Sequence, residues 1–159
     1  MKKDLEYPLD TSLILRKRRR IRSELSSNPS LKSIRIAILG GSTTSTVREM
    51  IEIFMLYHGF KAVFFECEYG KYFEDVVVDD SSLREFSPDI AFVCTTRKNV
   101  DHFPLMFDDQ DAVDKCLALE MNKYLKIWGK LTNDLGCLVI QNNFDLPTTR
   151  SLGNLDSSE

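Results

Sequence analysis

Short apolar runs and longer stretches with a helical repeat alternate along this chain. Runs rich in β-branched and other apolar residues predict buried strands at residues 34–39, 62–65, 90–94 and 137–140. Apolar residues that recur every three or four positions predict helices at about residues 44–58, 81–86 and 110–131. Strands that alternate with helices form βαβ units, so we expect a parallel sheet of at least four strands covered on both faces. The first run is almost entirely apolar, which places its strand in the interior of the sheet.

The apolar positions of the two longer predicted helices indicate which side each one buries. In the first helix the buried side is predicted to carry Val47, Ile51, Phe54 and Met55. In the second, one stripe carries Val113, Leu117, Tyr124 and Trp128. Both sets have the spacing of a helix that packs on a sheet through one face.

The first 32 residues differ in charge from the rest, with nine Lys or Arg against four Asp or Glu, while the remainder has twelve against twenty. Asp10 or Thr11 can cap the N-terminus of a helix here. The segment from Ser26 to Ser30, which contains Pro29, ends this helix and forms a linker. We expect a basic helix outside the sheet and weakly packed. Its positive charge could contact nucleic acid, an anionic lipid surface or an acidic protein, or it could simply be solvated. It has no interleaved aromatic residues for base stacking, and we expect neither a nucleic acid nor a membrane partner.

Composition bounds the class of protein. A chain of 159 residues with 43% hydrophobic and 28% charged residues fits one globular domain. Its four cysteines lie far apart, which suits neither a disulfide framework nor a zinc site, so we expect reduced thiols and a cytoplasmic protein. The acidic residues between positions 66 and 80 have the pattern of a solvated face, and we expect neither a metal nor another cofactor.

Polar residues follow all four predicted strands. Open parallel sheets bind ligands at the carboxyl ends of their strands, so we expect a ligand site there. The candidate residues are Ser42 as the catalytic residue, with Gly40, Gly41, Thr43, Gly70, Thr95, Thr96, Asn142 and Asn143 as oxyanion or substrate ligands. Glycines allow a close backbone approach, the amides of Ser42 and Thr43 at a helix N-terminus can bind an anion, and asparagine amides can donate to an oxyanion. The alternatives are a simple helix cap at Ser42 and a turn at the asparagines.

Ser42 needs a base if it is to act as a nucleophile. Only His58 and His102 are available, and neither follows a predicted strand. We therefore expect an exposed Ser42 in a cleft with Gly70, Thr95, Thr96 and Asn142 or Asn143, without a histidine beside its hydroxyl. The glycine turn also lacks the lysine of a phosphate-binding P-loop, which argues against nucleotide hydrolysis of that type.

An ordered series of segments resembles the N-terminal region of FkbH-like proteins, the HAD-IIIC group. The resemblance extends from about residue 12 to 156, and its motifs read IAILGGSTT, FECEYGKYFED, FSPDI, TTRKN, IQNNF and LGNLD. It implies a three-layer α/β/α sandwich of the flavodoxin-like, SGNH-hydrolase-like (GDSL-like) type. Ser42 falls at the SGNH serine, Gly70 near the second oxyanion block and Thr96 near the third.

The family is associated with loading a phosphoglycerate-derived three-carbon unit onto an acyl carrier protein and removing its phosphate, in polyketide-type biosynthesis. Residues 1–32 are the basic helix and linker expected from their charge and spacing, and the resemblance implies that residues 33–159 are an SGNH-like domain that is shortened at its C-terminus. Partners would be an acyl carrier protein and a small acyl or phosphorylated substrate.

Three departures from the family pattern affect this expectation. The chain has no DxxH-like block for an acid–base pair and no DxDxT motif for HAD phosphatase chemistry, and Gly70 stands where many relatives have asparagine. We therefore expect the front part of a larger enzyme that positions substrate or carrier and is inactive alone. The alternative is a protein-docking module that uses the fold as a scaffold.

Overall fold

A computed structural model describes residues 2–105 and 107–145, and a single four-stranded parallel sheet lies at their centre. The strands are β1 (Lys32–Gly40), β2 (Phe60–Glu66), β3 (Ile90–Cys94) and β4 (Leu138–Gln141). Their order is β2-β1-β3-β4, and each neighbouring pair is parallel. The predicted sheet and the interior position of its first strand are confirmed.

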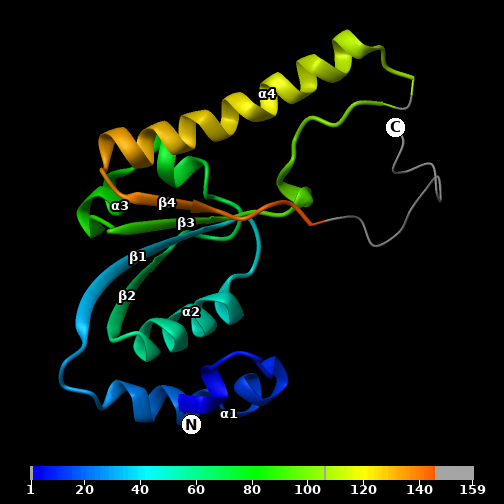
Figure 1. Cartoon of the computed structure of the whole chain (residues 1–159). Helices are drawn as coiled ribbons and strands as arrows, with labels where there is room; N and C mark the ends of the chain where they lie inside the picture. Colours follow the sequence, from blue (N-terminus) through cyan, green and yellow to red (C-terminus); the bar gives the residue numbers. More distant parts are fainter. Residues whose placement is uncertain (1, 106, 146–159) are drawn as a thin grey trace.

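Helices cover both faces of the sheet, as the predicted three-layer α/β/α sandwich requires. The helix α2 (Ser45–Tyr57) lies on one face, and α3 (Ser81–Phe86) and α4 (Gln110–Gly129) lie on the other (Figure 1). The chain moves to one side from β1 to β2 and to the opposite side from β2 to β3 and β4. Because such crossovers are right-handed, this reversal sends the helices to opposite faces.

The main core lies between the sheet and the α3–α4 face. Alternate strand residues, such as Leu39 and Val93, pack there against Leu83, Ile127 and Leu131. Four short helical turns complete the described elements: the 3-10 turns η1 (Lys2–Leu5) and η3 (Arg97–Asn99), and the π-helical turns η2 (Glu74–Val78) and η4 (Lys130–Asp134).

The basic helix α1 (Thr11–Ser26) lies outside the sheet, against the outer side of α2 (Figure 1). The Asp10 side chain caps it by accepting a hydrogen bond from the Leu13 N–H at 2.9 Å. Ile14 and Ile21 are 2% and 1% exposed and pack with Ile53 of α2. Burial of a side chain of this size stabilises by about 1.5–3 kcal/mol. The expected position outside the sheet is confirmed, but the expected weak packing is wrong.

Two helices bury different residues from those predicted. In α2 the most buried side chains are Ile53 and Leu56, and Ile53 is buried because α1 packs against it on the side of this helix that faces away from the sheet. In α4, Tyr124 is buried as expected, but Leu117 is 61% exposed. The first half of α4 extends beyond the sheet, so nothing in the sheet reaches that part of the predicted stripe (Figure 1).

An apolar groove of about 580 Å³ lies between α2 and the sheet. Its lining includes Val47, Ile51, Phe54 and Met55 of the predicted buried side, together with Ile36, Phe92 and Ile140 of the sheet. The side of β3 and β4 towards this groove is left partly open, since α2 packs mainly on the β2 side of the sheet. Accordingly Leu138 is 62% exposed and Ile140 46%.

Candidate functional site

The Gly40–Gly41 turn ends β1 and is tied to both neighbouring strands. The Gly40 N–H donates to Cys67 Sγ at 3.1 Å, after β2, and the Gly41 N–H donates to the Cys94 carbonyl at 3.1 Å, at the end of β3. A Cβ on Gly41 would collide with the side chain of Asn99. Glycine is therefore required here because another side chain packs directly on the backbone.

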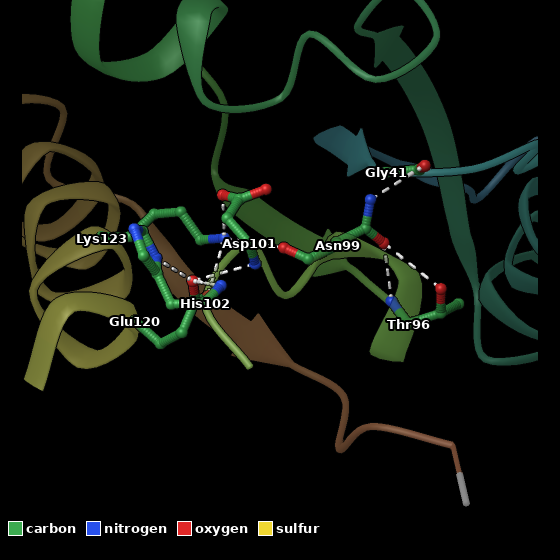
Figure 2. Close-up of polar contacts among 7 residues, drawn as sticks. All are labelled: Gly41, Thr96, Asn99, Asp101, His102, Glu120 and Lys123. Atoms are coloured by element: carbon green, nitrogen blue, oxygen red, sulfur yellow. Dashed lines mark hydrogen bonds and ion pairs between the residues drawn. The ribbon is translucent and has the colours of Figure 1, made fainter. Parts of the chain in front are cut away.

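Asn99 holds two strand ends together. Its Nδ2 donates to the Gly41 carbonyl at 3.1 Å, while its Oδ1 accepts from the Thr96 N–H at 2.9 Å (Figure 2). Thr96 caps η3 by accepting from the Lys98 N–H at 3.3 Å. Sequence reasoning missed Asn99, although the Thr-x-x-Asn spacing has the form of a capping box and could have indicated it.

Thr95 and Asn142 connect the ends of β3 and β4. Asn142 Oδ1 accepts from the Thr95 N–H at 3.0 Å, and Asn142 Nδ2 donates to the Thr95 carbonyl at 2.7 Å. Gln141 Nε2 donates to the Thr95 hydroxyl at 2.9 Å. Thr95 is fully buried, so it lines no cleft, and the Asn142 amide is occupied by backbone contacts. Asn143 is exposed, and its carbonyl accepts from Asn142 Nδ2 at 2.7 Å.

Ser42 is half-buried and Thr43 exposed in the segment between β1 and α2. The helix begins at Ser45, with Thr44 as its N-cap, so Ser42 and Thr43 precede the first helical turn. Their amides therefore do not belong to the helix N-terminus, contrary to the expectation. Among the described residues no hydrogen bond joins the Ser42 hydroxyl to either histidine; His102 Nδ1 bonds to Glu120, and His58 packs edge-on against Tyr57 at the end of α2. The role of Ser42 stays a prediction.

A cleft of about 430 Å³ opens beside this edge of the sheet, between the segment after β2, the turn η3 and α4. We call it the lysine cleft, because it is lined by Lys98, Lys123 and Lys126. Gly70, with φ of +75°, Asn99 and Asn122 also line it, as do the carboxylates Glu74 and Asp101. Of the residues predicted for the site, only Gly70 lines the lysine cleft.

Lys123, which lines the lysine cleft, forms a charged centre with Glu120 and Asp101 (Figure 2). Lys123 Nζ lies 2.8 Å from Glu120 Oε2 and 2.7 Å from Asp101 Oδ2, and it donates to the Asn99 carbonyl at 2.7 Å. Glu120 is buried, at 9% exposed, and its Oε1 accepts from the N–H groups of Asp101 and His102 at 2.9 and 3.0 Å. This network fastens the loop after β3 to α4 and thereby positions Asn99.

The electrostatics of this network keep both central groups charged. Burial acts to raise the pKa of Glu120, but the hydrogen bonds from Lys123, His102 and the Asp101 N–H outweigh burial and hold that pKa below its usual value. Burial acts to lower the pKa of Lys123, but Asp101 and Glu120 outweigh burial and hold that pKa well above its usual range. Lys123 is therefore neutralised by its own partners. Lys98 and Lys126 are exposed and pair with no acidic side chain among the described residues.

The sequence carried one signal for this network that its interpretation missed. Glu120 lies between Leu117 and Tyr124 on the stripe of α4 that was predicted to be apolar. A charged residue on a buried helical stripe indicates a buried partner, because an unpaired buried charge is costly. The partner Lys123 is three residues further along the same helix.

The sheet order, the two helical layers and a cleft at the carboxyl ends of the strands define a doubly wound α/β protein of the three-layer class. No family model and no curated protein matches the sequence. Among solved structures, the chain is similar to the N-terminal part of the protein BF1531 from Bacteroides fragilis, which contains a phosphatase domain and is complexed with Mg, at a TM-score of 0.66 and 16% identity. The match covers 89% of this chain and 36% of the other, and it shows that the two share a fold.

Within residues 2–105 and 107–145, no group of three or more His, Cys, Asp or Glu side chains is arranged to hold a metal ion. None of the helices in the described part of the chain is long and apolar enough to cross a membrane.

Proposed function

We propose that this chain is an SGNH-like domain of an FkbH-like HAD-IIIC enzyme, and that it binds a small acyl or phosphorylated group in the lysine cleft. The observation that carries the proposal is a cleft of ligand size at the carboxyl edge of a doubly wound sheet, lined by two lysines that pair with no acidic side chain among the described residues. The similarity in fold to the N-terminal part of a phosphatase-domain protein and the motif resemblance support the family.

The charges around the lysine cleft favour a singly or doubly negative ligand. Lys123 is neutralised by Glu120 and Asp101, so the positive charge that has no acidic partner in the described part of the chain comes from Lys98 and Lys126. The amides of Asn99 and Asn122 add uncharged polar groups, although Asn99 already bonds to Gly41 and Thr96. The Glu74 carboxylate lies in the same lining and disfavours a ligand of high negative charge.

Binding and positioning fit the geometry better than hydrolysis at Ser42. A serine hydroxyl needs an adjacent base to act as a nucleophile at neutral pH. In the described residues the Ser42 hydroxyl has no histidine partner, and Ser42 does not line the lysine cleft. The domain would therefore hold the three-carbon unit, or its carrier, for chemistry performed elsewhere in a larger enzyme.

Calorimetric titration with inorganic phosphate tests this function. Lys98→Ala and Lys126→Ala should each weaken binding about tenfold, because a hydrogen bond to a charged group contributes about 1.5–3 kcal/mol. Lys115→Ala is the matched control, since Lys115 is an exposed lysine of the same helix α4 that lies outside the cleft. Absence of binding at millimolar ligand, or equal losses in Lys115→Ala, would contradict the proposal.

A second function, docking of an acidic acyl carrier protein, is favoured by the surface of α1. Arg18 and Arg22 pair with Glu49 and Glu52 of α2 at 2.8 and 3.3 Å. Arg16, Arg19 and Arg20 are exposed and pair with no acidic side chain in the described part of the chain. These three arginines are the charges left for a partner.

Binding of an acyl carrier protein should therefore weaken steeply with salt, because exposed charges are screened within about 10 Å at 0.1 M ionic strength. The triple variant Arg16/Arg19/Arg20→Ala should abolish it, whereas Arg35→Ala, which removes an exposed arginine at the far side of the sheet that pairs with Asp89, should not. Binding that is independent of salt, or unchanged in the triple variant, would count against docking.

A further inference from the structure

Tyr72 and Tyr124 are buried tyrosines of the main core, and Tyr72 also lines the lysine cleft. Each of the two is 5% exposed. Tyr72 belongs to the segment after β2, whereas Tyr124 lies on α4 and directly follows Lys123, another residue of the cleft lining. The Lys123 Nζ atom is 5.3 Å from the centre of the Tyr124 ring. The cleft therefore borders on a part of the core that contains two phenolic hydroxyls.

The Tyr124 hydroxyl is buried and has no hydrogen-bond partner among the described residues. The Tyr124 ring packs against Trp128 and Phe144, with ring centres 6.2 and 5.8 Å away, so turning the hydroxyl out to water would break both contacts. A buried donor without a partner costs free energy that a phenylalanine at the same place would not cost. Packing alone therefore explains the ring of Tyr124 but not its hydroxyl.

The Tyr72 hydroxyl is a neighbour of this unpartnered group. The pKa of the Tyr72 phenol is raised, first by burial and then by the nearby Tyr124 phenol, while the charge of Lys123 acts to lower it. Tyr72 therefore stays a neutral O–H donor at physiological pH. Its hydroxyl also bonds to no described side chain, but it is not among the buried unpartnered groups of the described residues, so it reaches the surface of the cleft that Tyr72 lines.

We propose that the Tyr72 hydroxyl donates a hydrogen bond to an anionic oxygen of the ligand in the lysine cleft, and that Tyr124 is the positioning residue for this donor. In the complex the Tyr124 O–H donates to the Tyr72 oxygen, which turns the Tyr72 proton towards the ligand. The ligand is then held by one uncharged donor and by the ammonium groups of Lys98 and Lys126. The inference rests on the proposed ligand site in the cleft, and it concerns binding alone, since no covalent bond is made or broken.

Calorimetric titration of the 159-residue chain with inorganic phosphate tests the donor. Tyr72→Phe should weaken phosphate binding about tenfold, because it removes a hydrogen bond to a charged group, and it should not lower the urea midpoint. Tyr69→Phe is the matched control, since Tyr69 lies in the same segment but is 78% exposed and outside the cleft lining. Wild-type affinity in Tyr72→Phe, while Lys126→Ala still binds weakly, refutes the inference and leaves the cleft function standing. Absence of phosphate binding by the wild type refutes the cleft function, and the inference with it.

Tyr124→Phe tests the positioning residue, because stability and affinity should change in opposite directions. Without phosphate the variant should unfold at a higher urea concentration than the wild type, since a buried unpartnered hydroxyl is removed. It should also bind phosphate at least threefold more weakly, and its gain in stability should shrink in saturating phosphate, where the wild-type hydroxyl is paired. A lowered urea midpoint would show that the hydroxyl is already satisfied in the free protein, and unchanged affinity would show that it serves the core alone. Either result overturns the role of Tyr124.

Discussion

Gly41 is the residue at which the ends of β1 and β3 depend on the absence of a side chain. Its N–H bonds to the end of β3, its carbonyl accepts from Asn99, and the Asn99 side chain occupies the space of a Cβ. Asn99 cannot simply turn away, because its Oδ1 also holds the Thr96 N–H. A small change at one backbone position would therefore disturb the loop that carries Lys98 and His102.

Gly41→Ala should lower the free energy of unfolding by about 1–3 kcal/mol, the usual range for a side chain forced into a filled space. Urea denaturation measures this value. Gly129→Ala is the control, since Gly129 lies at the end of α4 and its nearest neighbour would be 3.9 Å from an added Cβ. It should be neutral or slightly stabilising, because alanine favours a helix over glycine. Equal effects at the two positions would show that Asn99 does not restrict Gly41.

Ser42→Ala should leave the free energy of unfolding nearly unchanged, since the Ser42 hydroxyl makes no hydrogen bond within the described residues. The 159-residue chain should hydrolyse a p-nitrophenyl ester no faster than the buffer, because a serine without a base is a poor nucleophile. Ester hydrolysis that disappears in Ser42→Ala would disprove the predicted inactivity.

At the scale of elements, the loop after β3 and the helix α4 are held together by one buried carboxylate. Glu120 accepts from two backbone N–H groups of this loop and pairs with Lys123 and His102. Without the Glu120 charge, the positive charge of Lys123 would be paired with Asp101 alone. The loop after β3 would then be held less firmly to α4. The element that carries the lysine cleft is thus stabilised by a contact between residues about twenty positions apart.

Glu120→Gln should lower the free energy of unfolding by about 3 kcal/mol at pH 7. This value is at the lower end of the range for removing one partner of a buried ion pair. The pKa of Glu120 is lowered on folding, so its contribution is present above the ordinary value of 4.5 and is lost as the pH falls through the folded value. Urea unfolding at pH 7 and pH 3.5 should therefore show the difference between variant and wild type shrinking in acid. The exposed Glu85→Gln is the control and should change little at either pH. A difference that grows in acid would contradict the lowered pKa.

The strands and most helices could be predicted because their signals are local. Residues 34–39 and 90–94 are apolar runs that only a buried strand explains, and Asp10 before residue 11 marks the start of a helix. The contacts of the site are not local. Asn99 meets Gly41 from 58 positions away, and Asn142 meets Thr95 from 47, so residue types alone could not show that these amides serve the backbone instead of a ligand.

At the scale of the whole molecule, the two proposed binding surfaces lie on opposite sides of the sheet. The lysine cleft involves α4 on one side, while α1 lies beyond α2 on the other (Figure 1). Lys126→Ala should weaken ligand binding without changing carrier binding, and the triple arginine variant should do the reverse. Calorimetry of both variants with both partners measures this independence. Loss of both activities in either variant would indicate a single shared site.

The apolar groove beside α2 has a consequence for how this chain behaves in solution. Leu138 and Ile140 of β4, an edge strand of the described sheet, expose apolar surface to water, and Phe92 of β3 lines the groove beside Ile140. Native protein at neutral pH should therefore bind the dye ANS and fluoresce, a response usually associated with loosened, partly unfolded states. It should also grow cloudy at high concentration and clear again on addition of mild detergent, because exposed apolar edges invite self-association. A dye assay used to judge folding quality would thus misjudge a correctly folded sample.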